Sequence, residues 1–166
     1  MATPELVTAV AADAREAAFG EFLRLESSGW KGNDGERSAL AHDAPLQTFY
    51  RELFTGPHAL PQAEINLLRL DGVAVAAQLC VLSGGTRSLL KIAYQQELQK
   101  FSPGSVLLDA VLRRSCATRD AQRLSFVTSE AWMSEWGASA TPVGDLWLLH
   151  GRILHTIAAL LIGSGR

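Results

Sequence analysis

The residues best suited to chemistry lie where a helix is expected to open, at Ser102-Pro103-Gly104-Ser105. Serine is a preferred N-cap residue, and proline is a preferred first residue of a helix. Apolar residues then recur at three- and four-residue spacing as far as Arg114. Because the first turn of a helix carries free N–H groups and a partial positive charge, this opening predicts an anion site suited to a pyrophosphate.

Two side chains elsewhere are candidates for proton transfer. Tyr94 ends an expected strand, where it could orient a reacting group or a water, although packing of a half-buried aromatic ring explains it equally well. Glu130 could act as a general base, because an ammonium nucleophile must lose a proton before it attacks. Glu64 has a weaker claim of the same kind, and for both the alternative is a solvated carboxylate. The four histidines show no metal-ligand spacing, so we assign no metal.

Hydrophobic periodicity and turn residues predict the elements that must position these groups. The expected elements, in chain order, are helices over residues 16–28 and 46–54, strands over 65–70, 73–82 and 88–94, the helix from 102, strands over 124–127 and 146–149, and a terminal helix over 153–162. Asp71-Gly72 is a strong signal for a two-residue hairpin, so the three central strands form an antiparallel meander.

The order of these elements predicts the fold class. A strand, the helix from Ser102 and a further strand form a crossover, which should be right-handed and place its two strands parallel. The chain is therefore expected to be mixed α/β (α+β), with a central, mostly antiparallel sheet that holds one parallel crossover pair and is flanked by helices. We expect one domain over residues 1–166, with its core over about 16–150.

Composition narrows the classes of function. The chain has 166 residues, 48% hydrophobic and 19% charged, which are the proportions of a folded soluble protein. A net charge of -2 gives no global attraction for nucleic acid. No signal peptide is evident, and the apolar stretch 153–162 is shorter than the ~20 residues that span a bilayer. Cys80 and Cys116 are expected to be buried, reduced thiols, which favours a cytoplasmic location.

Four segments, taken together and in this order, resemble one family. They are Phe22 to Gly32 (FLRLESSGWKG), Leu70 to Ala76 (LDGVAVA), Leu90 to Tyr94 (LKIAY) and Phe101 to Gly104 (FSPG). They are similar to the GNAT-fold acetyltransferase domains associated with bacterial cellulose biosynthesis, which read L-E-x-x-G-W-K-G, L-D-G-x-x-V/I-A, L-K-x-A-Y/F-D-E and Y-S-P-G. The match runs from about Phe19 to Leu149.

The resemblance implies the GNAT acyl-CoA N-acyltransferase fold, with acetyl-CoA or another acyl-CoA as cofactor. The acyl group would pass to an amine or sugar-amine acceptor, and Tyr94 would lie beside the thioester. The resemblance places the cofactor against Ile92, Ala93, Lys100, Ser102, Gly104, Ser105 and Val106. It places the acceptor against Glu26, Trp30, Lys31 and Trp132.

The chain departs from the family pattern in two places. The superfamily loop usually reads R/Q-x-x-G-x-G/A, but here Pro103 and Ser105 replace the two glycines, and proline supplies no N–H. Trp132 and Met133 stand where Tyr and Lys are usual, and an indole cannot act as a general acid. Two alternatives therefore stay open, a catalytically degenerate CoA-binding or scaffolding domain and one half of a two-domain acyltransferase.

The sequence also predicts an assembly. Trp132 and Trp136 lie in one short segment with Met133, and the terminal helix over 153–162 is apolar. These residues would either pack internally or leave an exposed apolar patch, and large patches indicate interfaces. We expect a homodimer.

Overall fold

The computed structural model describes residues 3–28, 40–128 and 130–144. The chain divides into two compact units, Met1–Thr128 and Ser129–Arg166. The expected strand over 146–149 and the expected helix over 153–162 lie outside the described residues, as do Trp30 and Lys31. Within the described ranges, no helix is long and apolar enough to cross a membrane.

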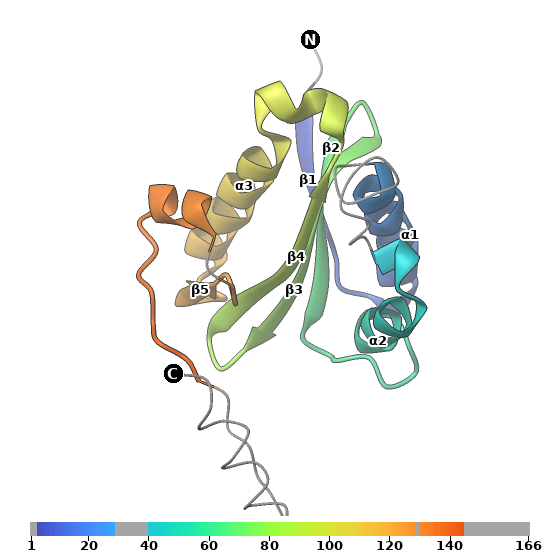
Figure 1. Cartoon of the computed structure of the whole chain (residues 1–166), viewed down its shortest axis with the longest axis horizontal. Coiled ribbons are helices and arrows are strands. Elements are labelled where there is room, and N and C mark those ends of the chain that lie inside the picture. The colour runs from blue at the N-terminus through green and yellow to red at the C-terminus, as the bar shows by residue number, and fades with distance from the viewer. Residues whose placement is uncertain (1–2, 29–39, 129, 145–166) are drawn as a thin grey trace, which may run out of the picture. The chain divides into compact units, whose positions relative to one another are not determined.

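The first unit is built on a five-stranded sheet (Figure 1). Its strands lie side by side in chain order: β1 (Pro4–Ala9), β2 (Ala63–Leu70), β3 (Val73–Ser83), β4 (Thr86–Tyr94) and β5 (Arg123–Ser125). Neighbouring strands are antiparallel except β4 and β5, which are parallel. The helices are α1 (Ala12–Ser28), η1 (Leu40–His42), α2 (Ala44–Phe54), η2 (Gln96–Phe101) and α3 (Pro103–Thr118), and the second unit holds η3 (Ala131–Trp136). The predicted fold class is confirmed.

Strand β1 was not predicted from the sequence, because little in its own residues marks it as a strand. It is an edge strand, and most of its side chains are exposed or only half-buried. It is held by β2, more than fifty residues away, through the backbone register and through a 2.8 Å hydrogen bond from Thr8 Oγ1 to Asn66 Oδ1. Such a non-local pairing leaves no periodic signal in the local sequence.

The predicted hairpin between β2 and β3 is confirmed. Asp71 and Gly72 have φ values of +49° and +80°, the left-handed pair that a two-residue turn of this kind requires. Strand β3 is buried along most of its length, as a nearly unbroken apolar run predicts. This hairpin places β3 at the centre of the sheet, with β4 beside it.

The sheet is covered on both faces, with α1 and α2 on one side and α3 on the other (Figure 1). On the α1/α2 face, Phe19, Phe22 and Leu25 of α1 join the strands in the larger hydrophobic core. On the α3 face, Leu107 and Val111 pack on β2 and β3. Since residues four apart share one face of a helix, this pair fixes which side of α3 lies on the sheet.

The sheet opens beside β4, and this opening positions the candidate site. Strand β5 pairs with β4 only from Thr86 to Ser88, whereas β4 continues to Tyr94. The register with β3 passes from Lys91 directly to Leu89, so Leu90 is an extra residue that forms a β-bulge. Beyond Ser88, β4 therefore has a free edge on the side away from β3, among the residues that the structure describes.

Candidate active site

The free edge of β4 presents backbone donors. The Gln95 N–H donates to the Val75 carbonyl at 2.9 Å, so residue 95 bonds toward β3. Successive residues of a strand direct their backbone groups to opposite sides. The N–H groups of Tyr94 and Ile92 therefore point away from β3, toward the side where β5 has ended. A carbonyl group laid along this edge could accept hydrogen bonds from them.

The start of α3 differs in detail from the expected anion site. Ser102 precedes the helix as predicted, but it has a left-handed φ of +50° and its side chain makes no capping hydrogen bond. The N–H groups of Ser105 and Val106 both donate to the Ser102 carbonyl, at 2.9 and 3.1 Å. These two N–H groups are therefore bonded within the start of the helix, and the cofactor contacts expected of Ser105 and Val106 stay predictions. Gly104 keeps an N–H that has no acceptor among the described residues.

Gly104 has a packing role that the sequence did not reveal. A Cβ built at this position would lie 3.2 Å from Ile92 Cδ1 and 3.6 Å from Tyr94 Cδ1. The missing side chain therefore allows the first turn of α3 to lie against the end of β4. This contact brings the free N–H of Gly104 close to the strand edge described above. A larger residue would therefore disturb the fold as well as a ligand.

We expect Gly104→Val to lower both stability and cofactor affinity. Overpacking a buried site typically costs about 1–3 kcal/mol, and the valine methyl groups would displace Ile92 and Tyr94. Urea denaturation measures the first effect, and calorimetry with acetyl-CoA measures the second. Gly20→Val is the matched control, because a Cβ at this helical glycine meets nothing within 4 Å. If both variants are equally stable, the packing role of Gly104 is wrong.

The remaining predicted cofactor residues lie around the same place. Lys100 is exposed at the end of η2, with its Nζ 4.9 Å from the centroid of the Phe101 ring, and it provides a cation beside the start of α3. Ser102 and Ser105 are exposed and add two hydroxyl groups. Ala93 is buried in the hydrophobic core on the α1/α2 side, so its methyl group does not face this helix start.

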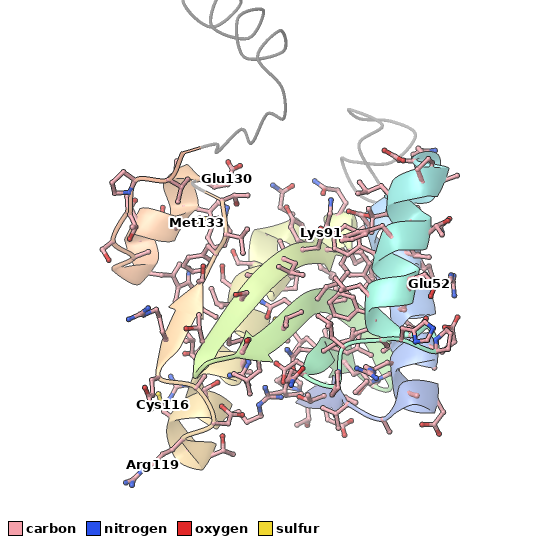
Figure 2. All side chains as sticks on the ribbon, turned by 90° about the horizontal axis from the view of Figure 1, so that it is seen from below. Glu52, Lys91, Cys116, Arg119, Glu130 and Met133 are labelled. Carbon is pink, nitrogen blue, oxygen red and sulfur yellow. The ribbon has the colours of Figure 1, made fainter. Side chains whose placement is uncertain are left out.

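The opposite face of β4 holds a polar cluster that the sequence analysis identified only in part. Glu26 of α1 is 2% exposed, and its Oε2 accepts the Leu40 N–H at 2.8 Å. Its Oε1 lies 4.0 Å from Lys91 Nζ, which also sits 5.7 Å from the centroid of the Tyr50 ring. Burial, assisted by the charge of Glu26, raises the pKa of the Tyr50 phenol. Figure 2 shows Lys91 rising from β4 on the side where α1 and α2 lie.

Glu64 is part of the framework rather than a candidate base. It lies inside β2, not ahead of it, and accepts hydrogen bonds from Arg87 Nε at 2.8 Å, Asn66 Nδ2 at 2.9 Å and Arg114 Nη2 at 3.0 Å. Burial alone would raise the pKa of its carboxyl group, but these donors and the two guanidinium charges outweigh burial and hold the pKa below its ordinary value. The proposed solvated or basic role of Glu64 is therefore wrong.

The cysteines offer no nucleophile in the core. Cys80 is buried, and burial, with the nearby charge of Glu64, raises the pKa of its thiol to about 12. Cys116 is exposed on α3, so the expectation of burial is correct for Cys80 alone. In the described part of the chain, no three His, Cys, Asp or Glu side chains gather as a metal site would require.

Glu130, Trp132 and Met133 belong to the second unit. The Glu130 N–H donates to Met133 Sδ at 3.3 Å, and the Glu130 carbonyl accepts the Met133 N–H at 3.0 Å. Figure 2 labels both residues at the start of the short helix. Met133 is buried, whereas Trp132 and Trp136 are half-buried. The catalytic role expected of Glu130 and the acceptor contact expected of Trp132 stay predictions.

Comparison with known proteins agrees with this architecture. A family model described as an acetyltransferase (GNAT) domain matches residues 3–136. A ribosomal-protein-alanine N-acetyltransferase from Brucella melitensis biovar Abortus 2308 is similar in structure, with 16% identity, a TM-score of 0.56, and coverage of 90% of this chain and 100% of that chain. A possible acetyltransferase from Clostridium difficile 630 has 10% identity, a TM-score of 0.58, and coverage of 89% and 99%.

A third solved structure is the aminoglycoside N-acetyltransferase AAC(6')-Iy in complex with CoA. It has 12% identity and a TM-score of 0.54, and the match covers 91% of this chain and 97% of that chain. At such identities the likeness shows the fold alone. No curated protein matches the sequence.

Proposed function

The chain belongs to the acetyltransferase (GNAT) domain family, and we propose that it is an acyl-CoA-dependent N-acyltransferase that uses acetyl-CoA or a similar acyl-CoA. The observation that carries this proposal is the contact between Gly104 and the side chains of Ile92 and Tyr94. This contact brings the free N–H of Gly104, which is suited to phosphate, close to the free edge of β4, which is suited to a thioester carbonyl. When bound, acetyl-CoA supplies an activated acyl group and a thiol leaving group.

The residues at the start of α3 fit a pyrophosphate. Gly104 contributes one N–H and the partial positive charge of the helix, and Ser102 and Ser105 contribute exposed hydroxyl groups. Lys100 adds a full positive charge beside them. These groups compensate for the three backbone donors that a phosphate cannot use here. Pro103 has no N–H, and the N–H groups of Ser105 and Val106 bond to the Ser102 carbonyl. Phosphate binding here thus depends more on side chains than it would in a glycine-rich loop.

Backbone groups of β4 and the Tyr94 side chain have separate roles in the proposed acyl transfer. The N–H groups of Ile92 and Tyr94 polarise a carbonyl on the free edge of β4 and stabilise negative charge on its oxygen. The Tyr94 ring lies on the α3 face of the sheet, against the same helix start. We expect its phenol to donate a proton to the departing sulfur, a role open to the tyrosine that the family pattern has at the position of Trp132.

A second candidate function, a catalytically degenerate domain that binds acyl-CoA, is supported by two residues of η3. Trp132 and Met133 occupy the positions where the family pattern has its Tyr and Lys. Without a working acid, the chain would bind acyl-CoA and transfer the acyl group slowly or not at all. Affinity for acetyl-CoA with no turnover on any amine would favour this degenerate binding domain.

The proposal extends to the subfamily, the acceptor, the assembly and the location of the protein. The four segments named above support membership of the domains associated with bacterial cellulose biosynthesis, and a simple amine or sugar-amine acceptor is consistent with the family. A homodimer and a cytoplasmic location stay predictions. Half-buried Trp132 and Trp136 on η3 support the dimer, and light scattering measures its mass.

Acetyl-CoA should stabilise the protein measurably. At a concentration of about 100 times the dissociation constant, a ligand that binds only the folded state adds about 2.7 kcal/mol. For a chain of this size, this corresponds to a rise in Tm of about 5–10 °C. ATP, which carries phosphates but no pantetheine, is the control and should have a smaller effect. An unchanged Tm at millimolar acetyl-CoA, together with flat calorimetry, would overturn the proposed function.

A further inference from the structure

If the proposed transfer is correct, the acceptor reaches β4 from the face opposite α3. Side chains alternate along a strand, so Ile92 faces α3 whereas Lys91 faces α1 and α2. A cofactor held at the start of α3 reaches the free edge of β4 from the α3 side. The amine then approaches the same edge from the side of Lys91, Glu26 and Tyr50.

This cluster has hydrogen-bonding capacity that the described part of the chain does not use. Glu26 Oε1 is buried and has no hydrogen-bond partner among the described residues. Lys91 Nζ lies 4.0 Å away, which is too far for a hydrogen bond. Buried polar atoms are normally paired, and those that are not call for an explanation. A donor and an acceptor thus remain available within one small region beside the reacting edge.

The charge that a ligand meets here is positive. The Lys91 side chain is 20% exposed, whereas that of Glu26 is 1% exposed and lies behind it. The Tyr50 ring supports the ammonium group through a cation–π contact at 5.7 Å. A partly exposed ammonium attracts a carboxylate and repels a polycation, so the cluster discriminates among amines by the other charged groups that they carry.

We propose that Lys91, positioned by Glu26 and Tyr50, binds the carboxylate of the acceptor, which is therefore an amino acid or a similar amine that carries a carboxylate. In the transfer, the amine nitrogen bonds to the acyl carbon and the carbon–sulfur bond breaks. Of the two protons that the ammonium loses, one ends on the sulfur and one in solvent. Lys91 changes no bond in this step and acts on the position of the acceptor.

The test compares L-amino acids with their C-terminal amides, measured by the thiol released from acetyl-CoA. The parent should prefer the acids by about tenfold or more in kcat/KM, as a charge-assisted hydrogen bond allows. Lys91→Met should raise KM for the acids to the level of the amides, so that the ratio of kcat/KM for acids to kcat/KM for amides falls to about one. Lys91→Arg, which keeps the charge, should restore most of the preference. A purely structural role would not produce this split between acids and amides.

Calorimetry with acetyl-CoA separates the two proposals. Lys91→Met should bind acetyl-CoA as the parent does, because Lys91 faces away from α3. If the parent itself binds no acetyl-CoA, the proposed function fails and this inference fails with it. If the parent binds acetyl-CoA but accepts amides as well as acids, or accepts neither, the carboxylate site is wrong. If Lys91→Met still prefers the amino acids over their amides, the carboxylate site at Lys91 is also wrong.

Discussion

Glu64→Ala should lower the free energy of unfolding by about 3–5 kcal/mol, because it removes one partner of a buried ionic network. The Glu64 carboxylate accepts hydrogen bonds from Arg87, which is almost fully buried, and from Arg114. Without it, Asp120, at 2.9 Å, is the one charged partner that Arg87 keeps among the described residues, and Arg114 has no carboxylate partner there. Urea denaturation followed by circular dichroism measures the loss.

The control is a pair of the same chemistry on the surface. Arg113 and Asp109 form an ion pair at 2.7 Å on α3, but their side chains are 79% and 47% exposed. Such pairs contribute about 0.3–0.5 kcal/mol in measured helices, so Asp109→Ala should have little effect. A loss in Glu64→Ala no greater than that in Asp109→Ala would show that the network does not hold the sheet to α3.

The same network predicts how stability depends on pH. The pKa of Glu64 lies below its ordinary value in the folded protein, as does that of Asp120, chiefly through its hydrogen bond from Arg87. A carboxyl group with a lowered pKa stabilises the fold above its unfolded pKa, and this contribution is lost as pH falls through the folded value. Stability should therefore decline below about pH 4.5 less steeply in Glu64→Gln than in the parent.

The sequence predicts this fold wherever local chemistry decides the structure. Asp71-Gly72 requires a left-handed turn, and Pro103 begins a helix, so both elements were predicted near their observed bounds. The edge strand β1 was missed because its partner lies far along the chain. The network was missed for the same reason, since Glu64, Arg87 and Arg114 are ordinary charged residues until the sheet and α3 bring them together.

For the candidate site, the sequence identified individual residues but not the contacts between them. The sequence identified Gly104 as important, but only the structure shows that its missing Cβ faces Ile92 and Tyr94 rather than a ligand. Glu26 and Lys91 lie in two separate family segments, and nothing in the sequence says that they meet across the α1/α2 face. A motif marks which residues matter, whereas their directions depend on the register of β4 and the packing of α3.

Tyr94→Phe should lower kcat by about 100-fold or more while leaving acetyl-CoA affinity unchanged. The substitution removes only the hydroxyl group, and general acid catalysis typically contributes about 10²–10⁴-fold. The ring keeps its place against the start of α3 and in the core formed with Leu107 and Val111. Steady-state kinetics on the best acceptor, with calorimetry for acetyl-CoA, separates catalysis from binding.

The Tyr94 hydroxyl group has no tyrosine substitute on the α3 face of the sheet. The chain has only two tyrosines, and Tyr50 lies on the other face of β4, so it cannot replace Tyr94 against α3. A kcat in Tyr94→Phe within about threefold of the parent would exclude Tyr94 as the acid and return that role to another group or to water.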